Sequence, residues 1–223
     1  MDMNEIFGSG GVVASRFPGY ENRKEQCELA TAVWETIEAE GGEVLVAEAP
    51  PGVGKTFALL VPALLHCIPK DERILVLTGS IPLQEQLVSK DIPSIETILG
   101  RQVTYGLLKG RGNYACLRRC RELGGDGFLS FGDEGEASRT VLSWIDSTKT
   151  GDLSELSFDQ HNQVLSAIAS SGRGCIGSAC PERDRCFVLA QLRRAQEWQV
   201  VGANYHLFFS YILEAGKPFP IPF

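Results

Sequence analysis

The segment Gly52-Val53-Gly54-Lys55-Thr56 has the residue types needed to hold a phosphate group. Glycines let successive backbone N–H groups point at one anion, and a helix starting at Lys55 would add its positive end. A lysine here can reach the β- and γ-phosphates of a nucleotide, and the threonine hydroxyl can hold Mg2+. We therefore expect a nucleotide site with Lys55 and Thr56 as catalytic residues; the alternative is a glycine-rich turn in which Gly-Lys-Thr occurs by coincidence. The residues expected to bind the nucleotide in this loop are Ala49, Pro50, Pro51, Gly52, Val53, Gly54, Lys55 and Thr56.

A second polar group, Tyr20, Arg23 and Gln26, lies at the start of the first expected helix, about one helix ahead of the loop. A glutamine amide both donates and accepts hydrogen bonds, so it can recognise one base edge such as that of adenine. We expect these three residues to contribute to nucleotide binding. The alternative is an ordinary surface glutamine near a helix start.

Four of the seven cysteines follow the pattern C-x58-C-x4-C-x5-C. Zinc sites commonly use C-x2-C pairs, and neither of the short spacings here fits that pattern. Four thiolates can instead hold the larger iron–sulfur cubane. Cys27 and Cys67 fall in expected helices and are interpreted as core residues, while Cys120 is a spare thiol or an alternative to the first of the four. The four candidate ligands are Cys116, Cys175, Cys180 and Cys186.

Charge is unevenly distributed along the chain, although the net charge is -7. The stretch 101–121 has six basic residues and no acid, whereas 122–159 has nine acids and two basic residues. Basic side chains interleaved with tyrosines are typical of grooves that bind single-stranded nucleic acid. The basic stretch is therefore a candidate DNA surface, and the alternative is a set of solvated charges that balance the acidic segment.

The elements that must position these residues alternate between helix and strand, which predicts a doubly wound parallel α/β sheet. Apolar residues recur at spacings of three and four in the helical segments, and the strands are short apolar runs. Only weak helical patterns, at 137–145 and 158–169, interrupt the polar stretch after Lys109. The expected helices are 22–40, 55–67, 82–89 and 187–198, and the expected strands are 43–48, 73–78, 102–105 and 199–203.

The domain organisation follows from this change of pattern. Residues 1–16 are expected to form a loose leader, residues 17–108 and 187–223 one α/β domain, and residues 109–186 a mainly helical insertion. The longest apolar stretch is too short to cross a bilayer, which takes about 20 residues. The acidic N-terminus does not look like a secretory signal, so a cytoplasmic protein without membrane contact is expected.

The chain resembles the superfamily 2 DNA helicases of the XPD/DinG type over residues 17–213. The cysteine spacing is closer to DinG than to XPD. Between the last expected strand and His206, the chain has Asn204-Tyr205 where the family has Asn directly before His. The segments that carry the resemblance are 20–26, 48–56, 78–86, 109–116 and 200–204, together with Cys175, Cys180 and Cys186.

This resemblance implies an ATP-dependent 5'-to-3' DNA helicase whose first RecA-like domain, a P-loop parallel sheet, carries an inserted [4Fe-4S] domain ligated by the four cysteines. It implies ATP and Mg2+ as cofactors and single-stranded or forked DNA as partner. We separately expect a monomer, with a repair or CRISPR-type complex as a further candidate partner. The family continues into an Asp-Glu-x-His strand and a second RecA-like domain, so the 223-residue chain alone is expected not to hydrolyse ATP. The residues expected to contact DNA are Thr78, Ser80, Gln84, Arg111, Tyr114 and Arg118.

A different class of function stays open from the sequence. The chain could be a nucleotide-binding module with a structural Zn2+ site that acts in a repair or RNA-guided complex. The zinc and iron content of protein purified without oxygen distinguishes the two.

Overall fold

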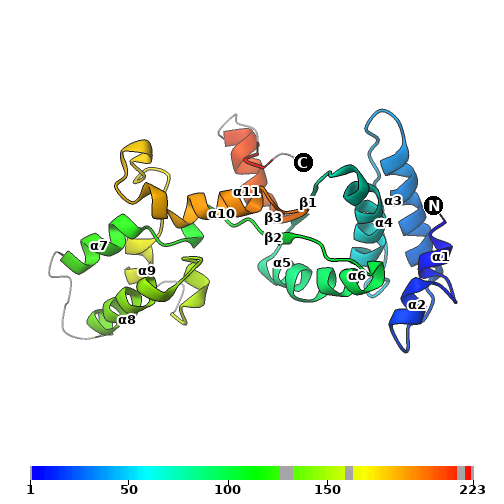
Figure 1. Cartoon of the computed structure of the whole chain (residues 1–223), viewed down its shortest axis with the longest axis horizontal. Coiled ribbons are helices and arrows are strands. Elements are labelled where there is room, and N and C mark those ends of the chain that lie inside the picture. Colours follow the sequence, from blue (N-terminus) through cyan, green and yellow to red (C-terminus); the bar gives the residue numbers. More distant parts are fainter. Residues whose placement is uncertain (1, 126–132, 159–162, 215–218, 222–223) are drawn as a thin grey trace. The chain divides into compact units, whose positions relative to one another are not determined.

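The computed structural model describes residues 2–125, 133–158, 163–214 and 219–221 (Figure 1). The chain forms two compact units, the first made of Met1–Leu107 and Glu197–Phe223 and the second of Leu108–Gln196. In the described part of the chain, no helix has the length and apolar character that a membrane span needs.

The first unit contains a parallel three-stranded sheet. Strands β1 (Ile74–Thr78) and β2 (Tyr105–Leu107) both pair with β3 (Val200–Asn204), which gives the order β1-β3-β2. Val200 lies opposite Ile74 on one side and Tyr105 on the other. The expected α/β class and parallel pairing are confirmed, and the sheet is compatible with part of a RecA-like domain. β2 starts at the last residue of the run expected to form it.

Two long helices, α3 (Lys24–Glu38) and α4 (Lys55–Lys70), pack against each other beside this sheet. Their contact is apolar because Ala30, Ala58 and Leu64 are fully buried. Both helices match the sequence expectation. The remaining helices of the unit are α5 (Ile81–Gln86), continued by a π-helical turn (Leu87–Asp91), α6 (Ile92–Leu99) and α11 (Tyr205–Phe209), continued by a second π-helical turn (Ser210–Glu214).

The N-terminal residues are not a loose leader, which corrects the expectation for 1–16. They form two short helices, α1 (Asn4–Phe7) and α2 (Val12–Arg16), and Figure 1 shows them beside α3. Met3 and Phe7 are 1% and 0% exposed and belong to the main core of the unit. Burial of these apolar side chains holds the segment in place.

Residues 43–48 do not form the expected strand. The segment is assigned to no strand, and Val44 and Val46 are 87% and 91% exposed. An apolar run becomes a strand only where a neighbouring strand satisfies its backbone groups. Within the described residues, the sheet ends at β1 and does not include this run.

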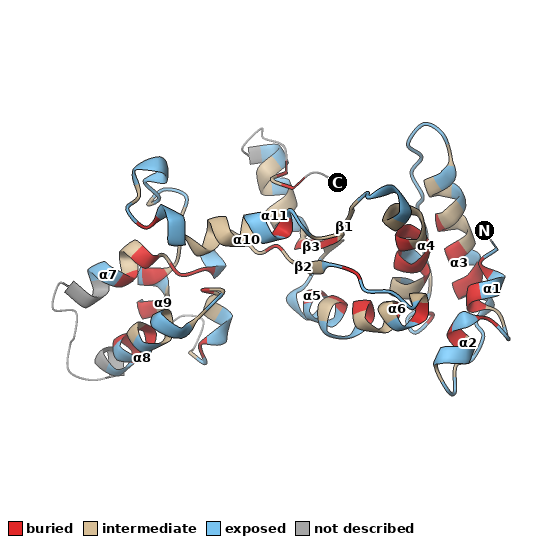
Figure 2. Cartoon of the chain, viewed as in Figure 1, coloured by how far each residue is buried: buried red, intermediate tan, exposed pale blue. Residues whose placement is uncertain are grey.

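The second unit is mainly helical. Its core is formed by the contacts of α7 (Leu117–Gly125), α8 (Asp133–Ser147) and α9 (Gln163–Ile168), which carry buried positions in Figure 2. This core includes Cys120, Val141 and Ile168. The two weak helical patterns in the sequence correspond to α8 and α9, although residues 159–162 lie outside the described part. The helices are α7 (Leu117–Gly125), α8 (Asp133–Ser147), α9 (Gln163–Ile168) and α10 (Phe187–Ala195), with 3-10 turns at Arg111–Asn113, Leu153–Glu155, Gly177–Ala179 and Arg183–Arg185.

Candidate functional site

The expected phosphate loop leads directly into α4. Gly52 and Gly54 both have φ of 86°, a left-handed conformation that a side chain makes costly. Gly54 is the residue before the first helical turn, and its carbonyl accepts hydrogen bonds from the N–H groups of Phe57 and Ala58. The two glycines are therefore required by the turn that starts the helix. This geometry places the positive end of a 16-residue helix at the loop.

Arg23 and Gln26 both reach the loop from the start of α3. The Arg23 guanidinium donates to the Gly52 carbonyl at 2.6 Å, and Gln26 Nε2 donates to the Gly54 carbonyl at 3.1 Å. Gln26 is only 3% exposed, so it is not an ordinary surface glutamine. The structure thus brings each side chain to a residue far along the sequence: Gly52 lies 29 residues after Arg23, and Gly54 lies 28 residues after Gln26.

Tyr20 completes this arrangement. Its hydroxyl lies 2.9 Å from both Gln26 Oε1 and the Phe7 carbonyl. Burial raises the pKa of Tyr20, against the opposing effect of the nearby Arg23 charge. The hydroxyl therefore remains a hydrogen-bond donor at any physiological pH.

Lys55 is exposed and bends back onto its own loop. Its Nζ donates to the carbonyls of Ala49 at 2.8 Å and Pro50 at 2.9 Å. An ammonium group carries three donors, and a bound phosphate would take over some of them. The ammonium group of Lys55 therefore lies at the loop, where its hydrogen-bond partners are two uncharged carbonyl groups.

Thr56 follows Lys55 in the first turn of α4. It lines a cavity of about 480 Å3 between α4 and β1, together with Thr78, Gly79 and Tyr205. Apolar side chains such as Leu60 and Leu87 form much of its wall. The threonine expected to hold Mg2+ and the first residue of the expected DNA motif therefore share one cavity.

The expected DNA contacts of the first unit divide into two kinds. Thr78 and Ser80 lie at the carboxyl end of β1, where Ser80 is exposed and the Thr78 hydroxyl donates to its carbonyl at 3.3 Å. Gln84 is 3% exposed. Its side chain is buried in this structure, and its contact with DNA stays a prediction.

The expected DNA contacts of the second unit also differ in their exposure. Arg111 is exposed, as a strand-binding residue must be. Tyr114 is 3% exposed, and burial raises its pKa, so its ring offers no stacking platform. Arg118 forms an ion pair with Glu122 and donates to the Gly174 carbonyl at 2.9 Å. It holds the loop before Cys175 to α7.

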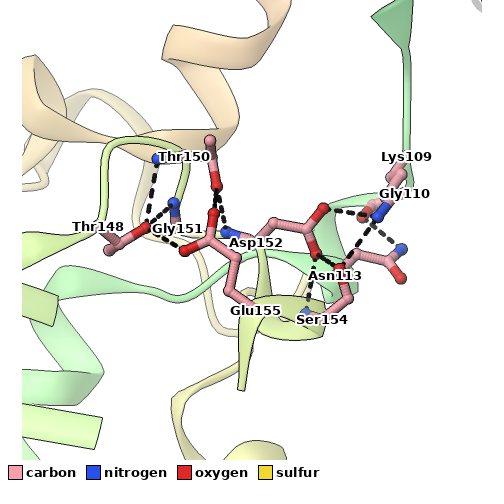
Figure 3. A network of polar contacts seen from close by, with 9 residues as sticks. All are labelled: Lys109, Gly110, Asn113, Thr148, Thr150, Gly151, Asp152, Ser154 and Glu155. Carbon is pink, nitrogen blue, oxygen red and sulfur yellow. Dashed lines mark hydrogen bonds and ion pairs between the residues drawn. The ribbon is translucent and has the colours of Figure 1, made fainter. Parts of the chain in front are cut away.

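A polar network that sequence reasoning missed anchors the basic stretch (Figure 3). Lys109 Nζ donates to Asp152 Oδ2 at 2.6 Å, and Asp152 Oδ1 accepts from the hydroxyl and N–H of Ser154. Glu155 accepts hydrogen bonds from the hydroxyls of Thr148 and Thr150 and from the Trp144 indole. Lys109 is therefore committed to a structural ion pair. Asp152 follows Gly151, a pairing that suggests a turn, but nothing in the sequence near Asp152 indicates that Lys109 is its partner.

The four candidate ligand cysteines are free thiols. Cys116 and Cys186 directly precede α7 and α10, and a 3-10 turn fills each of the short spacings after Cys175 and Cys180. Thiolates are a suitable donor set for an iron–sulfur cluster. In the described ranges, no three Cys, His, Asp or Glu side chains are gathered around the position of a single metal ion. The donor chemistry suits the iron–sulfur cluster, which is larger than a single ion.

Cys120 differs from these four. It is 2% exposed and belongs to the core of the second unit. Burial, followed by the nearby Cys116 charge, raises its pKa to about 12. The structure places Cys120 as an apolar core residue, consistent with its interpretation as a spare thiol.

The N-terminal helices are the main part of the site that sequence reasoning missed. Phe7 supplies the carbonyl that accepts from Tyr20. The signal was present, because Met3, Ile6 and Phe7 recur at spacings of three and four. A helix of four residues is too short for this pattern to stand out.

The fold and the loop together define an α/β protein with a phosphate-loop sequence at the start of a helix. No family profile matches the chain. It is 36% identical to the ATP-dependent DNA helicase YoaA of Haemophilus influenzae over 92% of the chain and 31% of that protein. It is also 36% identical to YoaA of Escherichia coli, over 93% of the chain and 32% of that protein.

A third relative is the ATP-dependent helicase DinG of Mycobacterium tuberculosis, 33% identical over 76% of the chain and 28% of that protein. The chain belongs to this DinG-type helicase family and matches the N-terminal portion of such a protein. It spans about a third of the length of the curated relatives it matches.

Proposed function

We propose that the chain is the nucleotide-binding portion of an ATP-dependent 5'-to-3' DNA helicase and that it binds ATP with Mg2+ at the loop before α4. One observation carries this proposal: Arg23 and Gln26 both hydrogen bond to the loop that contains Lys55. A chance Gly-Lys-Thr turn gives no reason for a buried glutamine amide to contact it. The helicase names of the relatives supply the reaction class.

In this proposal, each residue of the site has a separate task. Lys55 leaves the loop carbonyls to hold the β- and γ-phosphates, and the N–H groups at the start of α4 face the same anion. Thr56 provides a hydroxyl for Mg2+. The amide of Gln26 lies next to the loop, at the place where a base edge could use its remaining donor and acceptor capacity.

Single-stranded DNA is the proposed partner. In the first unit, the half-buried Thr78 and the exposed Ser80 at the end of β1 offer polar groups to a sugar-phosphate chain. In the second unit, the exposed Arg111 offers a positive charge to a phosphate. The proposal does not depend on Gln84 or Tyr114, because both are buried.

The iron–sulfur cluster stays a proposal that rests on the donor set of Cys116, Cys175, Cys180 and Cys186 and on the family. A bound cluster would tie α7 and α10 to the segment between them. Metal analysis of protein purified without oxygen should give about four irons per chain by the stoichiometry of this cluster. One zinc and no iron would contradict it.

The nucleotide proposal is tested with Lys55→Ala and the matched control Lys70→Ala. Both lysines are on α4, but Lys70 lies in its last turn, far along the helix from the loop. We expect Lys55→Ala to weaken binding of fluorescent ATP about tenfold or more, because an ammonium–phosphate contact is worth roughly 1.5–3 kcal/mol. Lys70→Ala should bind like the unchanged chain. Equal affinity in all three proteins would refute the site.

A further inference from the structure

The hydroxyl of Tyr20 links the N-terminal helix α1 to the phosphate loop through Gln26. On one side it lies 2.9 Å from the carbonyl of Phe7, the last residue of α1. On the other side it lies 2.9 Å from Gln26 Oε1, and the Nε2 of the same amide donates to the Gly54 carbonyl. These contacts form one continuous chain from residue 7 to residue 54.

The fixed end of this chain is α1. Phe7 is 0% exposed and Ile6 is 7% exposed, so the helix is anchored in the main core. Figure 1 shows α1 beside α3, the helix that contains Gln26. Cys27, the neighbour of Gln26, adds a second link, because its thiol donates to Asn4 Oδ1 at 3.2 Å. The Phe7 carbonyl is therefore a rigid acceptor.

The other end of the chain is the residue that starts α4. The Gly54 carbonyl accepts from Gln26 and also from two N–H groups of the first helical turn. A Cβ at Gly54 would lie 2.1 Å from Gln26 Nε2, so the amide packs directly against the loop backbone. The position of the Gln26 amide thus controls the direction of this carbonyl and of the N–H groups that follow it.

The proton count makes Tyr20 a shared donor. A phenol hydroxyl has one proton, and both of its partners are acceptors, so the Phe7 carbonyl and Gln26 Oε1 share that proton in a three-centre hydrogen bond. If a bound base takes Gln26 Oε1 as its acceptor, Tyr20 still has the Phe7 carbonyl. No buried donor is then left without a partner, which would cost stability.

We propose that Tyr20 is a positioning residue of the nucleotide site, which orients the Gln26 amide from the anchored end of α1 and thereby holds the phosphate loop in its binding conformation. The inference deepens the proposed function and rests on it. It assigns a role to the N-terminal helix that neither the loop motif nor the family names contain.

The test uses Tyr20→Phe, which removes the hydroxyl and keeps the ring, and Tyr105→Phe as a control. Tyr105 lies in β2, and the described structure shows no link from its hydroxyl to the loop. We expect Tyr20→Phe to weaken ATP binding about five- to tenfold, the effect of one buried hydrogen bond. Tyr105→Phe should bind ATP normally.

A double-mutant cycle separates positioning from a general structural effect. Because Tyr20 acts through Gln26, Tyr20→Phe should weaken ATP binding in the unchanged chain and have no further effect in a Gln26→Ala background. Additive losses would overturn the proposal, since they would mean that the hydroxyl acts independently of the amide.

Hydrogen exchange of the ligand-free protein gives a readout that does not depend on ATP. We expect faster exchange of the amides at 52–56 in Tyr20→Phe than in Tyr105→Phe, with unchanged exchange in β3. If the unchanged chain binds no ATP, the proposed function fails and this exchange pattern still tests the positioning role. If Lys55-dependent binding is present but Tyr20→Phe has normal affinity and exchange, the positioning role fails alone.

Discussion

At the scale of single residues, the charged form of Asp152 makes the stability of the second unit depend on pH. Burial by itself would raise the pKa of Asp152, but hydrogen bonds from Lys109 and Ser154 outweigh it and lower the pKa below the usual value. The pKa of Glu155 is lowered in the same way, against burial, by Thr150, Thr148 and Trp144. Both carboxylates therefore stabilise the fold in their charged form.

The sign of the pH dependence follows from this. A folded-state pKa below the unfolded value, about 3.9 for Asp, gives stability that is complete above that value and is lost as the pH falls through the folded pKa. We expect Asp152→Asn to lower the free energy of unfolding at pH 7 by about 1–3 kcal/mol. The difference from the unchanged chain should shrink below about pH 4, as measured by urea unfolding across pH.

Asp146→Asn is the matched control, because Asp146 is an exposed acid on α8 outside the network. It should have little effect at any pH. The lowest pH of the series, about 2.5, lies well below the pKa of an ordinary Asp. If the free energies of unfolding of Asp152→Asn and the unchanged chain differed by the same amount at pH 7 and at this pH, the ion pair with Lys109 would not stabilise the fold as described.

Local geometry was predictable where one short motif contains all the partners. The glycines and lysine of the loop fall within five residues, both glycines have a left-handed backbone, and Lys55 folds back onto the loop carbonyls. The burial of Tyr114 was not predictable because it depends on residues far along the chain: its carbonyl accepts a hydrogen bond from the Ser170 N–H, and its backbone forms a bridge with Asp152. Sequence distance hides such interactions.

At the scale of elements, the N-terminal helices contribute to the core of the first unit. Phe7→Ala removes a fully buried ring, which costs about 3–5 kcal/mol because a cavity remains. Val12, in the neighbouring helix, is 36% exposed, and Val12→Ala should change the free energy of unfolding by less than about 0.5 kcal/mol. Urea unfolding of both variants checks this. Equal stability of Phe7→Ala and Val12→Ala would mean that α1 is not part of the folded core.

Strands were predictable only where a partner strand exists. The runs at 73–78 and 199–203 have the same apolar character as 43–48, and they form β1 and β3 because they pair with each other. Composition indicates the tendency of a run to be buried, whereas pairing depends on the rest of the sheet. The run at 43–48 is exposed because, within the described residues, no strand pairs with it.

At the scale of the whole molecule, a net charge of -7 opposes DNA, so any binding must come from a local basic surface. Arg111 is exposed, whereas Lys109 and Arg118 are held in ion pairs with Asp152 and Glu122. Arg111 is therefore the residue of this group that is best placed to contact phosphate.

We expect Arg111→Glu to weaken binding of single-stranded DNA and to flatten its salt dependence by about 0.7 in the log-log slope for each phosphate that the protein no longer neutralises. Arg139→Glu, an exposed position on α8 in the acidic segment, is the control and should leave the slope unchanged. Fluorescence anisotropy between about 50 and 200 mM salt, the range over which such slopes are measured, provides the readout. Identical slopes for both variants would place the DNA path elsewhere.

The exposed run at 43–48 has a consequence for how the isolated chain behaves in concentrated solution. Val44 and Val46 are almost fully accessible, and β1 has only β3 as a neighbour in the described sheet. Short β-prone runs and unpaired strand edges recruit one another between molecules, which is the route to intermolecular cross-β aggregates. Soluble yield should therefore fall as concentration rises, and a charge introduced at Val44 should act as a gatekeeper against aggregation without disturbing any packed side chain.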